Sequence, residues 1–235
     1  MLRTIGSFLR WRTSSTNSHR STFGIVFLPR VCYGNRIEYS GDDPLREDVV
    51  SLTTPLTDAV VRTLTAGTVV AISGVVYTAR DNAHRRFIEL MDRGEPLPFD
   101  PRGAVIYYVG PTPAPPGRPI GSAGPTTAHR MDPFTPRLHA LGLKGTIGKG
   151  DRTDPVKRAL IEHTAVYFAA TGGVGALLSR HITAARVIAF DDLGPEAVRE
   201  LVLVDFPAIV AMDCFGNDIF VEGRGIYRGH GESGR

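Results

Sequence analysis

Four short segments of the chain concentrate polar residues and glycine: YTARDNAH (77–84), GPTTAHRM (124–131), GTIGKG (145–150) and TGGVGA (171–176). They lie at the ends of predicted strands, where α/β folds usually place their ligand sites. The planar fork of arginine matches a carboxylate, and lysine supplies a compact positive charge. These segments are therefore candidates for a ligand site, and each also has a purely structural interpretation.

The segment YTARDNAH has two interpretations. Arg80 follows a strand directly, so its guanidinium is placed to point at a carboxylate of a ligand. Alternatively, Asp81 is only the N-cap of the following helix and Arg80 is a solvated surface charge. The spacing leaves both interpretations open.

The segment GPTTAHRM combines a fixed turn with two hydroxyls and an arginine. Arg130 comes four residues after Thr126, so one helical turn would place both side chains on the same side. The alternative is a threonine N-cap followed by an exposed arginine. His129 is expected to be a surface histidine, or one that supports a ligand-binding residue, rather than a ligand itself, because no metal-ligand spacing surrounds it.

The two glycine-rich segments do not match nucleotide-binding motifs. A phosphate-binding loop needs four residues between its first glycine and Gly-Lys, and then Ser or Thr, whereas Gly150 follows Lys149 here. What remains is Lys149 on a glycine-flexed turn that can approach a small anion, or a plain turn. In TGGVGA, Leu178 occupies the position of the third glycine of a dinucleotide fingerprint, so a tight strand-to-helix turn is expected.

The elements around these segments predict the α/β fold class, with a mixed, mostly parallel sheet. Strands are expected at 69–79, 104–110, 143–147, 164–171 and 186–190, and helices at 57–65, 81–93, 127–141, 154–162 and after 172–175. A long ordered loop is expected at 110–125, because proline and glycine dominate it. The region 201–222 is expected to form strands joined by a hairpin turn at 215–217.

Composition narrows the function classes. The chain has 235 residues, of which 42% are apolar and 22% charged, and no apolar run approaches the roughly 20 residues that a transmembrane helix needs. Its two cysteines, Cys32 and Cys214, exclude a disulfide framework and a four-thiolate metal or iron–sulfur site within this chain. Six arginines and no acidic residue lie in 1–37, so this segment carries a charge of +6. Because the whole chain has a net charge of +3, residues 38–235 carry −3 and are mildly acidic. A nucleic-acid partner is therefore disfavoured.

The sequence divides into three expected regions. Residues 1–40 form an Arg/Ser-rich leader, expected to be disordered, which is either an organelle-targeting presequence or non-native upstream sequence. Residues 41–222 form the folded domain, and 223–235 form a flexible tail. The protein is expected in the cytoplasm, or in the mitochondrial matrix if the leader is a genuine presequence.

Five motifs in one order carry a family resemblance. They are Y-T-A-R-D-x-A-H (77–84), V-I-Y-Y-V-G-P (105–111), G-P-T-T-A-x-R-M (124–131), L-K-G-x-I-G-K-G (143–150) and V-D-F-P-A with D-x-x-G-N-D-x-F (204–220). Together they closely resemble the β subunit, or C-terminal domain, of the class I iron–sulfur fumarate hydratases and the related L-tartrate dehydratases. The resemblance implies a swivelling β/β/α domain that closes over an α subunit. In that family the α subunit holds a 4Fe-4S cluster with one open iron.

The resemblance also implies roles for four residues. It makes Arg80 and Arg130 the carboxylate-binding arginines, Lys149 a substrate-binding lysine, and Thr126 the catalytic threonine of proton transfer beside the departing hydroxyl. No metal ligand is expected in this chain, because the resemblance places the cluster on the α subunit of an α2β2-type assembly. The substrate would be a small dicarboxylate, and neither nucleic acid nor a membrane is an expected partner.

Three functions remain as alternatives. The first is an iron–sulfur-dependent hydro-lyase of the tricarboxylic acid cycle, in which this β subunit takes part in the reversible hydration of fumarate to (S)-malate. The second is the conversion of L-tartrate to oxaloacetate by the same reaction class. The third is a non-catalytic partner-binding subunit, which loss of Thr126, Arg130 or Lys149 would have favoured; all three residues are present.

Overall fold

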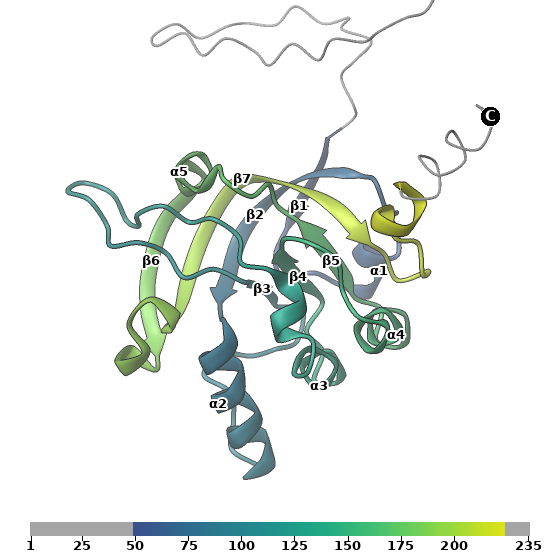
Figure 1. The fold of residues 1–235 in the computed structure, drawn as a ribbon, viewed down its shortest axis with the longest axis horizontal. Helices are drawn as coiled ribbons and strands as arrows, with labels where there is room; N and C mark the ends of the chain where they lie inside the picture. Colours follow the sequence, from purple (N-terminus) through teal and green to yellow (C-terminus); the bar gives the residue numbers. More distant parts are fainter. Residues whose placement is uncertain (1–48, 224–235) are drawn as a thin grey trace, which may run out of the picture. The chain divides into compact units, whose positions relative to one another are not determined.

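The structure is a computed structural model that describes residues 49–223 (Figure 1). The predicted leader (1–40) and nearly all of the predicted tail (223–235) lie outside the described residues. The strands are β1 Val50–Thr53, β2 Val69–Thr78, β3 Val105–Tyr107, β4 Gly145–Gly148, β5 Val166–Ala169, β6 Ile182–Ala189 and β7 Val198–Met212. The helices are α1 Asp58–Val61, α2 Asp81–Asp92, α3 Thr135–Ala140, α4 Asp154–Glu162 and α5 Gly175–Leu178, with 3-10 turns η1 Ala128–Met131, η2 Ser179–His181 and η3 Asp191–Glu196.

The seven strands form one mixed sheet in the order β1-β2-β3-β4-β5-β7-β6. The pairs from β1 to β5 are parallel, and β7 is antiparallel to each of its neighbours. This confirms the α/β class and the mostly parallel sheet. An additional antiparallel pairing joins β7 to β2, so β2, β3, β4, β5 and β7 close into a ring. The sequence pattern did not predict this closure.

Gly74 interrupts the apolar run of β2 without ending the strand. The register with β7 shifts between Ile72 and Gly74, which marks a β-bulge, and Gly74 has φ +105°. β2 is therefore one strand of ten residues that bends at a glycine. The bend lets one strand pair with β7 on both sides of the bulge.

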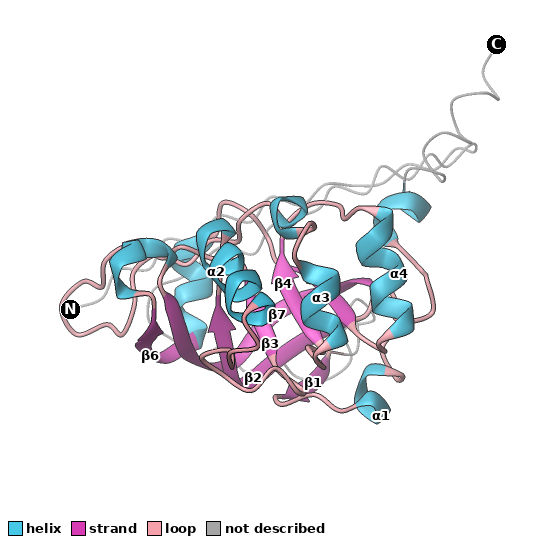
Figure 2. Ribbon diagram, turned by 90° about the horizontal axis from the view of Figure 1, so that it is seen from below, coloured by secondary structure: helices cyan, strands magenta, loops and turns pink. Residues whose placement is uncertain are grey.

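Three helices cover one face of the sheet: α2, α3 and α4 (Figure 2). The helix α2 has the predicted amphipathic pattern, with Ala83 and Phe87 buried against the sheet. His84 is buried on the same face, which its polarity did not predict. The predicted helix 127–141 is instead two elements, η1 and α3, because Pro133 lies between them.

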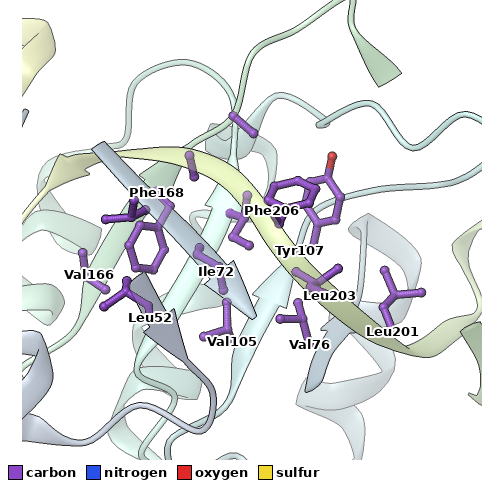
Figure 3. Packing of buried hydrophobic residues seen from close by; sticks show 14 of the residues in the cluster. Leu52, Ile72, Val76, Val105, Tyr107, Val166, Phe168, Leu201, Leu203 and Phe206 are labelled. Atoms are coloured by element: carbon purple, nitrogen blue, oxygen red, sulfur yellow. The ribbon is translucent and has the colours of Figure 1, made fainter. Parts of the chain in front are cut away.

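Two apolar cores lie on opposite faces of the ring strands. Along β3, Val105 and Tyr107 belong to one core and Ile106 to the other, as the alternation of side chains in a strand requires. The core inside the ring is shown in Figure 3, where Tyr107 and Phe206 pack edge to face at 5.2 Å between ring centres. The second core lies between the sheet and the helices.

The predicted hairpin at the end of the chain is wrong. The turn at 215–217 leads only to a single bridge between Met212 and Asp218, and residues 219–223 are helical. Asp213 accepts hydrogen bonds from the backbone amides of Phe215 and Asn217, and Asp218 accepts one from Phe220. These side chains occupy amides that a second strand would have used, so a helix starts instead. Among residues 49–223, no helix has both the length and the apolar character that a membrane span requires.

Candidate active site

The four segments that the sequence singled out meet at one edge of the sheet. Arg80 follows the end of β2, and Figure 1 shows α2 continuing from the arrowhead of that strand. Lys149 follows β4 directly, and Thr171 comes two residues after β5. Because β2 to β5 are parallel, their carboxyl ends lie on the same side, where α/β sheets form ligand sites.

Arg130 is held by a carboxylate from another segment. Its Nε lies 3.0 Å from Asp81 Oδ1, and its Nη2 lies 2.9 Å from Asp81 Oδ2. The interpretation of Asp81 as a helix N-cap is therefore wrong: Arg80 occupies the N-cap position, and Asp81 is the first residue of α2. A carboxylate in the first turn still interacts favourably with the helix dipole. The pair joins η1 to the start of α2.

Arg80 lies within reach of two carboxylates. Its Nη2 is 3.4 Å from Glu196 Oε1 and 3.9 Å from Asp81 Oδ2. Its Nε is buried and has no hydrogen-bond partner among the described residues. A Cβ at Gly110 would lie 2.8 Å from Arg80 Nη1 and 3.2 Å from Arg80 Cδ, so the side chain packs directly over this glycine and a larger residue would displace it. Arg80 is thus a held side chain rather than a solvated surface charge.

Glu196 belongs to the site and was missed by the sequence analysis. Besides its contact with Arg80, its Oε2 accepts a hydrogen bond of 3.0 Å from the backbone amide of Asn82. Glu196 lies in η3, 114 residues from Asn82 in the chain. No local pattern around Glu196 indicates this contact, because only the tertiary fold brings η3 to the start of α2.

Thr126 is not a helix cap. The N-cap position of η1 is Thr127, whose side chain makes no capping hydrogen bond, so the capping interpretation is wrong for both threonines. The backbone amide of Thr126 donates to Tyr108 O at 2.7 Å, and its carbonyl accepts from Lys149 N at 3.2 Å. Thr126 is half-buried, and its hydroxyl has no hydrogen-bond partner within residues 49–223. The hydroxyl is therefore free to meet a ligand.

Lys149 is exposed and lies beside the loop segment that carries Thr126. Its carbonyl accepts a hydrogen bond of 2.9 Å from Ala128 N, which completes a short parallel bridge. Its Cδ would be 3.4 Å from a Cβ at Gly172, so the side chain passes directly over the glycine turn. Unlike Arg80 and Arg130, Lys149 makes no ion pair with any described carboxylate. It is a cation available to an anionic ligand.

His84 supports Arg80 from inside the protein. Its Nδ1 lies 2.8 Å from Arg80 O, and its ring contacts Tyr108 edge to face at 5.4 Å. Burial lowers the pKa of His84 to about 4. The ring is therefore neutral near pH 7, so Nδ1 donates to the carbonyl and the residue does not supply a positive charge. His129 is exposed, in agreement with the expected surface histidine.

The described residues do not fit a metal cluster. Cys214 is the one cysteine within residues 49–223, and it is buried. In the same range, no three His, Cys, Asp or Glu side chains gather in a way that would hold a metal ion. The edge instead presents three cationic side chains together with threonine hydroxyls, that of Thr126 among them, that have no hydrogen-bond partner among residues 49–223. Such a set can bind and orient an anion that carries more than one carboxylate, and it can pass a proton through a hydroxyl.

Comparison with known proteins identifies relatives. The family model described as Fumarase C-terminus matches residues 33–223. Fumarate hydratase 2 of Leishmania major is 40% identical over 156 residues, which cover 66% of this chain and 28% of that protein. The class I anaerobic fumarate hydratase of Escherichia coli is 38% identical over 152 residues, which cover 64% of this chain and 28% of that protein.

A shorter relative matches over most of its length. The protein named "Putative L(+)-tartrate dehydratase subunit beta" from Methanocaldococcus jannaschii is 38% identical over 177 residues, which cover 71% of this chain and 89% of that protein. The match therefore covers little more than a quarter of the two fumarate hydratases but nearly all of the Methanocaldococcus protein.

Proposed function

The chain belongs to the fumarase C-terminus family, and on this premise we propose that it is the β subunit of a hydro-lyase that catalyses the reversible hydration of fumarate to (S)-malate. The observation that carries the proposal is the meeting of Arg80, Arg130, Lys149 and the free hydroxyl of Thr126 at one edge of the sheet. The homologous fumarate hydratases support the reaction class.

The three cations bind the two carboxylates of the substrate. Arg80, Arg130 and Lys149 carry three positive charges, and the neighbouring carboxylates of Asp81 and Glu196 offset two of them. The remaining positive charge favours an anionic ligand, and a dicarboxylate makes new pairs with N–H groups of the arginines and with Lys149. The clamp fixes the orientation of the carbon chain.

Thr126 transfers the proton at the substrate carbon next to the departing hydroxyl. A neutral threonine hydroxyl is a weak base, so it needs a second group that takes the proton onward. The described residues offer Thr126 no such hydrogen-bond partner, and we assign this second group to the α subunit. The β subunit thus orients the substrate and holds the relay hydroxyl in place.

The cofactor of the proposed enzyme is a 4Fe-4S cluster on the α subunit. When bound there, its open iron would act as a Lewis acid on the hydroxyl and carboxylate of the substrate. We propose an α2β2-type assembly in which the β subunit swivels over the α subunit. We place it in the cytoplasm, or in the mitochondrial matrix if residues 1–40 are a presequence.

L-Tartrate is the alternative substrate. The Methanocaldococcus relative is named as a tartrate dehydratase β subunit and matches this chain over 89% of its length. Fumarate and tartrate differ in hydroxyl groups, and both present the same two carboxylates to Arg80 and Arg130. The clamp therefore accepts either, and the choice rests on contacts with those hydroxyls.

The experiment is co-expression with the α subunit under anaerobic conditions. We expect the purified complex to be brown, oxygen-sensitive and active in fumarate hydration, while this chain alone is colourless and inactive. Assaying fumarate and L-tartrate on the same preparation separates the two substrates. Activity of the isolated chain, or an assembled and cluster-loaded complex that acts on neither substrate, would contradict the proposal.

A further inference from the structure

A buried ion pair joins the two segments that carry Arg130 and Lys149. Arg152 Nε donates to Asp132 Oδ1 at 2.6 Å, and the two side chains are 0% and 4% exposed. Asp132 is two residues after Arg130, and Arg152 is three residues after Lys149. Each member of the pair is thus two or three residues along the chain from a side chain of the candidate site.

Each nitrogen of Arg152 and each carboxylate oxygen of Asp132 has a hydrogen-bond partner in these two segments or in the residues packed against them. The second oxygen of Asp132 accepts from the backbone amide of Thr153 at 2.6 Å. The two terminal nitrogens of Arg152 donate to the hydroxyls of Thr146 at 3.1 Å and Thr135 at 2.9 Å. The pair therefore links β4, the loop after it, η1 and α3 at one point.

Aromatic rings complete the enclosure and connect it to Thr126. The guanidinium carbon of Arg152 lies 5.3 Å from the ring centre of Tyr108 and 4.9 Å from that of Tyr167. The backbone carbonyl of Tyr108 accepts the hydrogen bond from Thr126 N. The same arginine thus touches the residue that anchors the candidate catalytic threonine.

A buried ion pair of this kind contributes little net stability, because its desolvation is unfavourable. Removing both charges from water costs so much that apolar residues of similar size often stabilise a protein equally well. The benefit that remains is geometric, because a guanidinium with several directed hydrogen bonds holds its neighbours in one arrangement. Here the fixed arrangement is that of segments 126–132 and 149–153.

We propose that Arg152 and Asp132 are positioning residues, which set the distance between Arg130, Thr126 and Lys149 without touching the substrate. The claim that this pair positions substrate-binding and catalytic residues rests on the proposed function. The claim that the pair holds segments 126–132 and 149–153 together does not rest on it, and it is tested separately on the full chain without the α subunit.

The first test measures amide hydrogen exchange in the full chain. The double variant Arg152→Met/Asp132→Leu removes both charges and keeps the approximate volume. We expect the amides of Lys149 and Ala128, which bridge the two segments, to exchange at least about tenfold faster, while amides of the β2–β7 ladder are unchanged. The control Leu203→Ala opens a cavity beside the β2–β7 ladder, in which Leu203 pairs with Gly74, so it should accelerate exchange of the ladder amides without a selective effect on the bridge amides.

The second test measures kinetics of the assembled enzyme. We expect the double variant to lose on the order of 10²-fold in kcat/KM, with KM raised, because the clamp and the relay hydroxyl are misplaced. Arg152→Lys keeps the charge but loses the fork, so it should recover part of this loss. Leu203→Ala should lower the amount of folded enzyme and leave KM unchanged.

The outcomes separate the two ideas. Exchange that accelerates equally throughout the chain, or normal KM in the double variant, would overturn the positioning role and leave Arg152 a purely structural residue. An assembled wild type that acts on neither substrate would contradict the proposed function. Faster exchange confined to the bridge amides would support the linkage of the two segments even then.

Discussion

Asp81 contacts Arg130 twice, with 3.0 Å between Oδ1 and Nε and 2.9 Å between Oδ2 and Nη2. The same carboxylate lies 3.9 Å from Arg80, so one acidic side chain stands between the two arginines. A ligand carboxylate that approaches either arginine competes with Asp81 or takes the N–H groups that Asp81 leaves free. Because those N–H groups have fixed directions, an arginine at this position is not interchangeable with a lysine.

Replacement of Arg130 by lysine tests the clamp. Arg130→Lys keeps the charge but loses the planar fork, so we expect KM for the dicarboxylate to rise by about tenfold or more, with a smaller change in kcat. Steady-state kinetics of the assembled enzyme measure both. Arg137→Lys is the matched control, because Arg137 is also an exposed arginine paired with an aspartate, Asp92, and lies in α3. Equal effects of the two substitutions would contradict a clamp at Arg130.

Replacement of Thr126 by valine tests the proton relay. Thr126→Val keeps the shape and removes the hydroxyl, so we expect kcat to fall by roughly 10²-fold with little change in KM. The adjacent Thr127→Val is the control, and it should keep kcat close to the wild-type value. Near-normal kcat for Thr126→Val in a cluster-loaded complex would move the relay to another residue.

Two buried histidines predict that stability falls in acid. Burial lowers the pKa of His84 to about 4 and that of His139 to about 3. An unfolded histidine has a pKa of about 6.5, so between these values the unfolded chain binds more protons than the folded one. Stability from these groups is complete above about pH 6.5 and is lost as the pH falls toward the folded values. His84 alone would contribute up to about 3 kcal/mol of that loss.

Urea unfolding of the full chain across this pH range measures the effect. In His84→Gln/His139→Gln, we expect a lower free energy of unfolding at neutral pH but a flatter dependence between about pH 6.5 and pH 4. The exposed His129→Gln should keep the wild-type slope. A double variant whose slope equals that of the wild type would show that other groups cause the acid sensitivity.

The core inside the ring predicts a large effect of one aromatic residue. Phe206 is 0% exposed and packs against Tyr107 at the centre of this core. Phe206→Ala should lower the free energy of unfolding by about 3–5 kcal/mol, because it leaves a cavity that the closed ring cannot collapse around. The control Phe215→Ala removes a ring that is 54% exposed and should change stability by less than about 1 kcal/mol. Denaturant titration compares the two.

Much of the fold could be predicted from local pattern. The helix over 154–162 is observed at those residues, and α2 has its predicted amphipathic face. The pattern failed where side chains compete for backbone amides, as Asp213 and Asp218 do at the turn that was expected to form a hairpin. It also failed to place His84 in the core, because burial of a polar ring depends on a partner carbonyl that only the folded helix supplies.

By itself the sequence determined the residue types of the site and the strand ends from which they project, because apolar periodicity and glycine turns act over a few neighbouring residues. The tertiary structure decided the pairings. It joined Asp81 to Arg130, brought Glu196 to Arg80 and enclosed Arg152 with Asp132. It also closed the ring by pairing β7 with both β2 and β5. Contacts between distant segments depend on how whole helices and strands pack against one another, and the spacing of residues within one segment does not determine that packing.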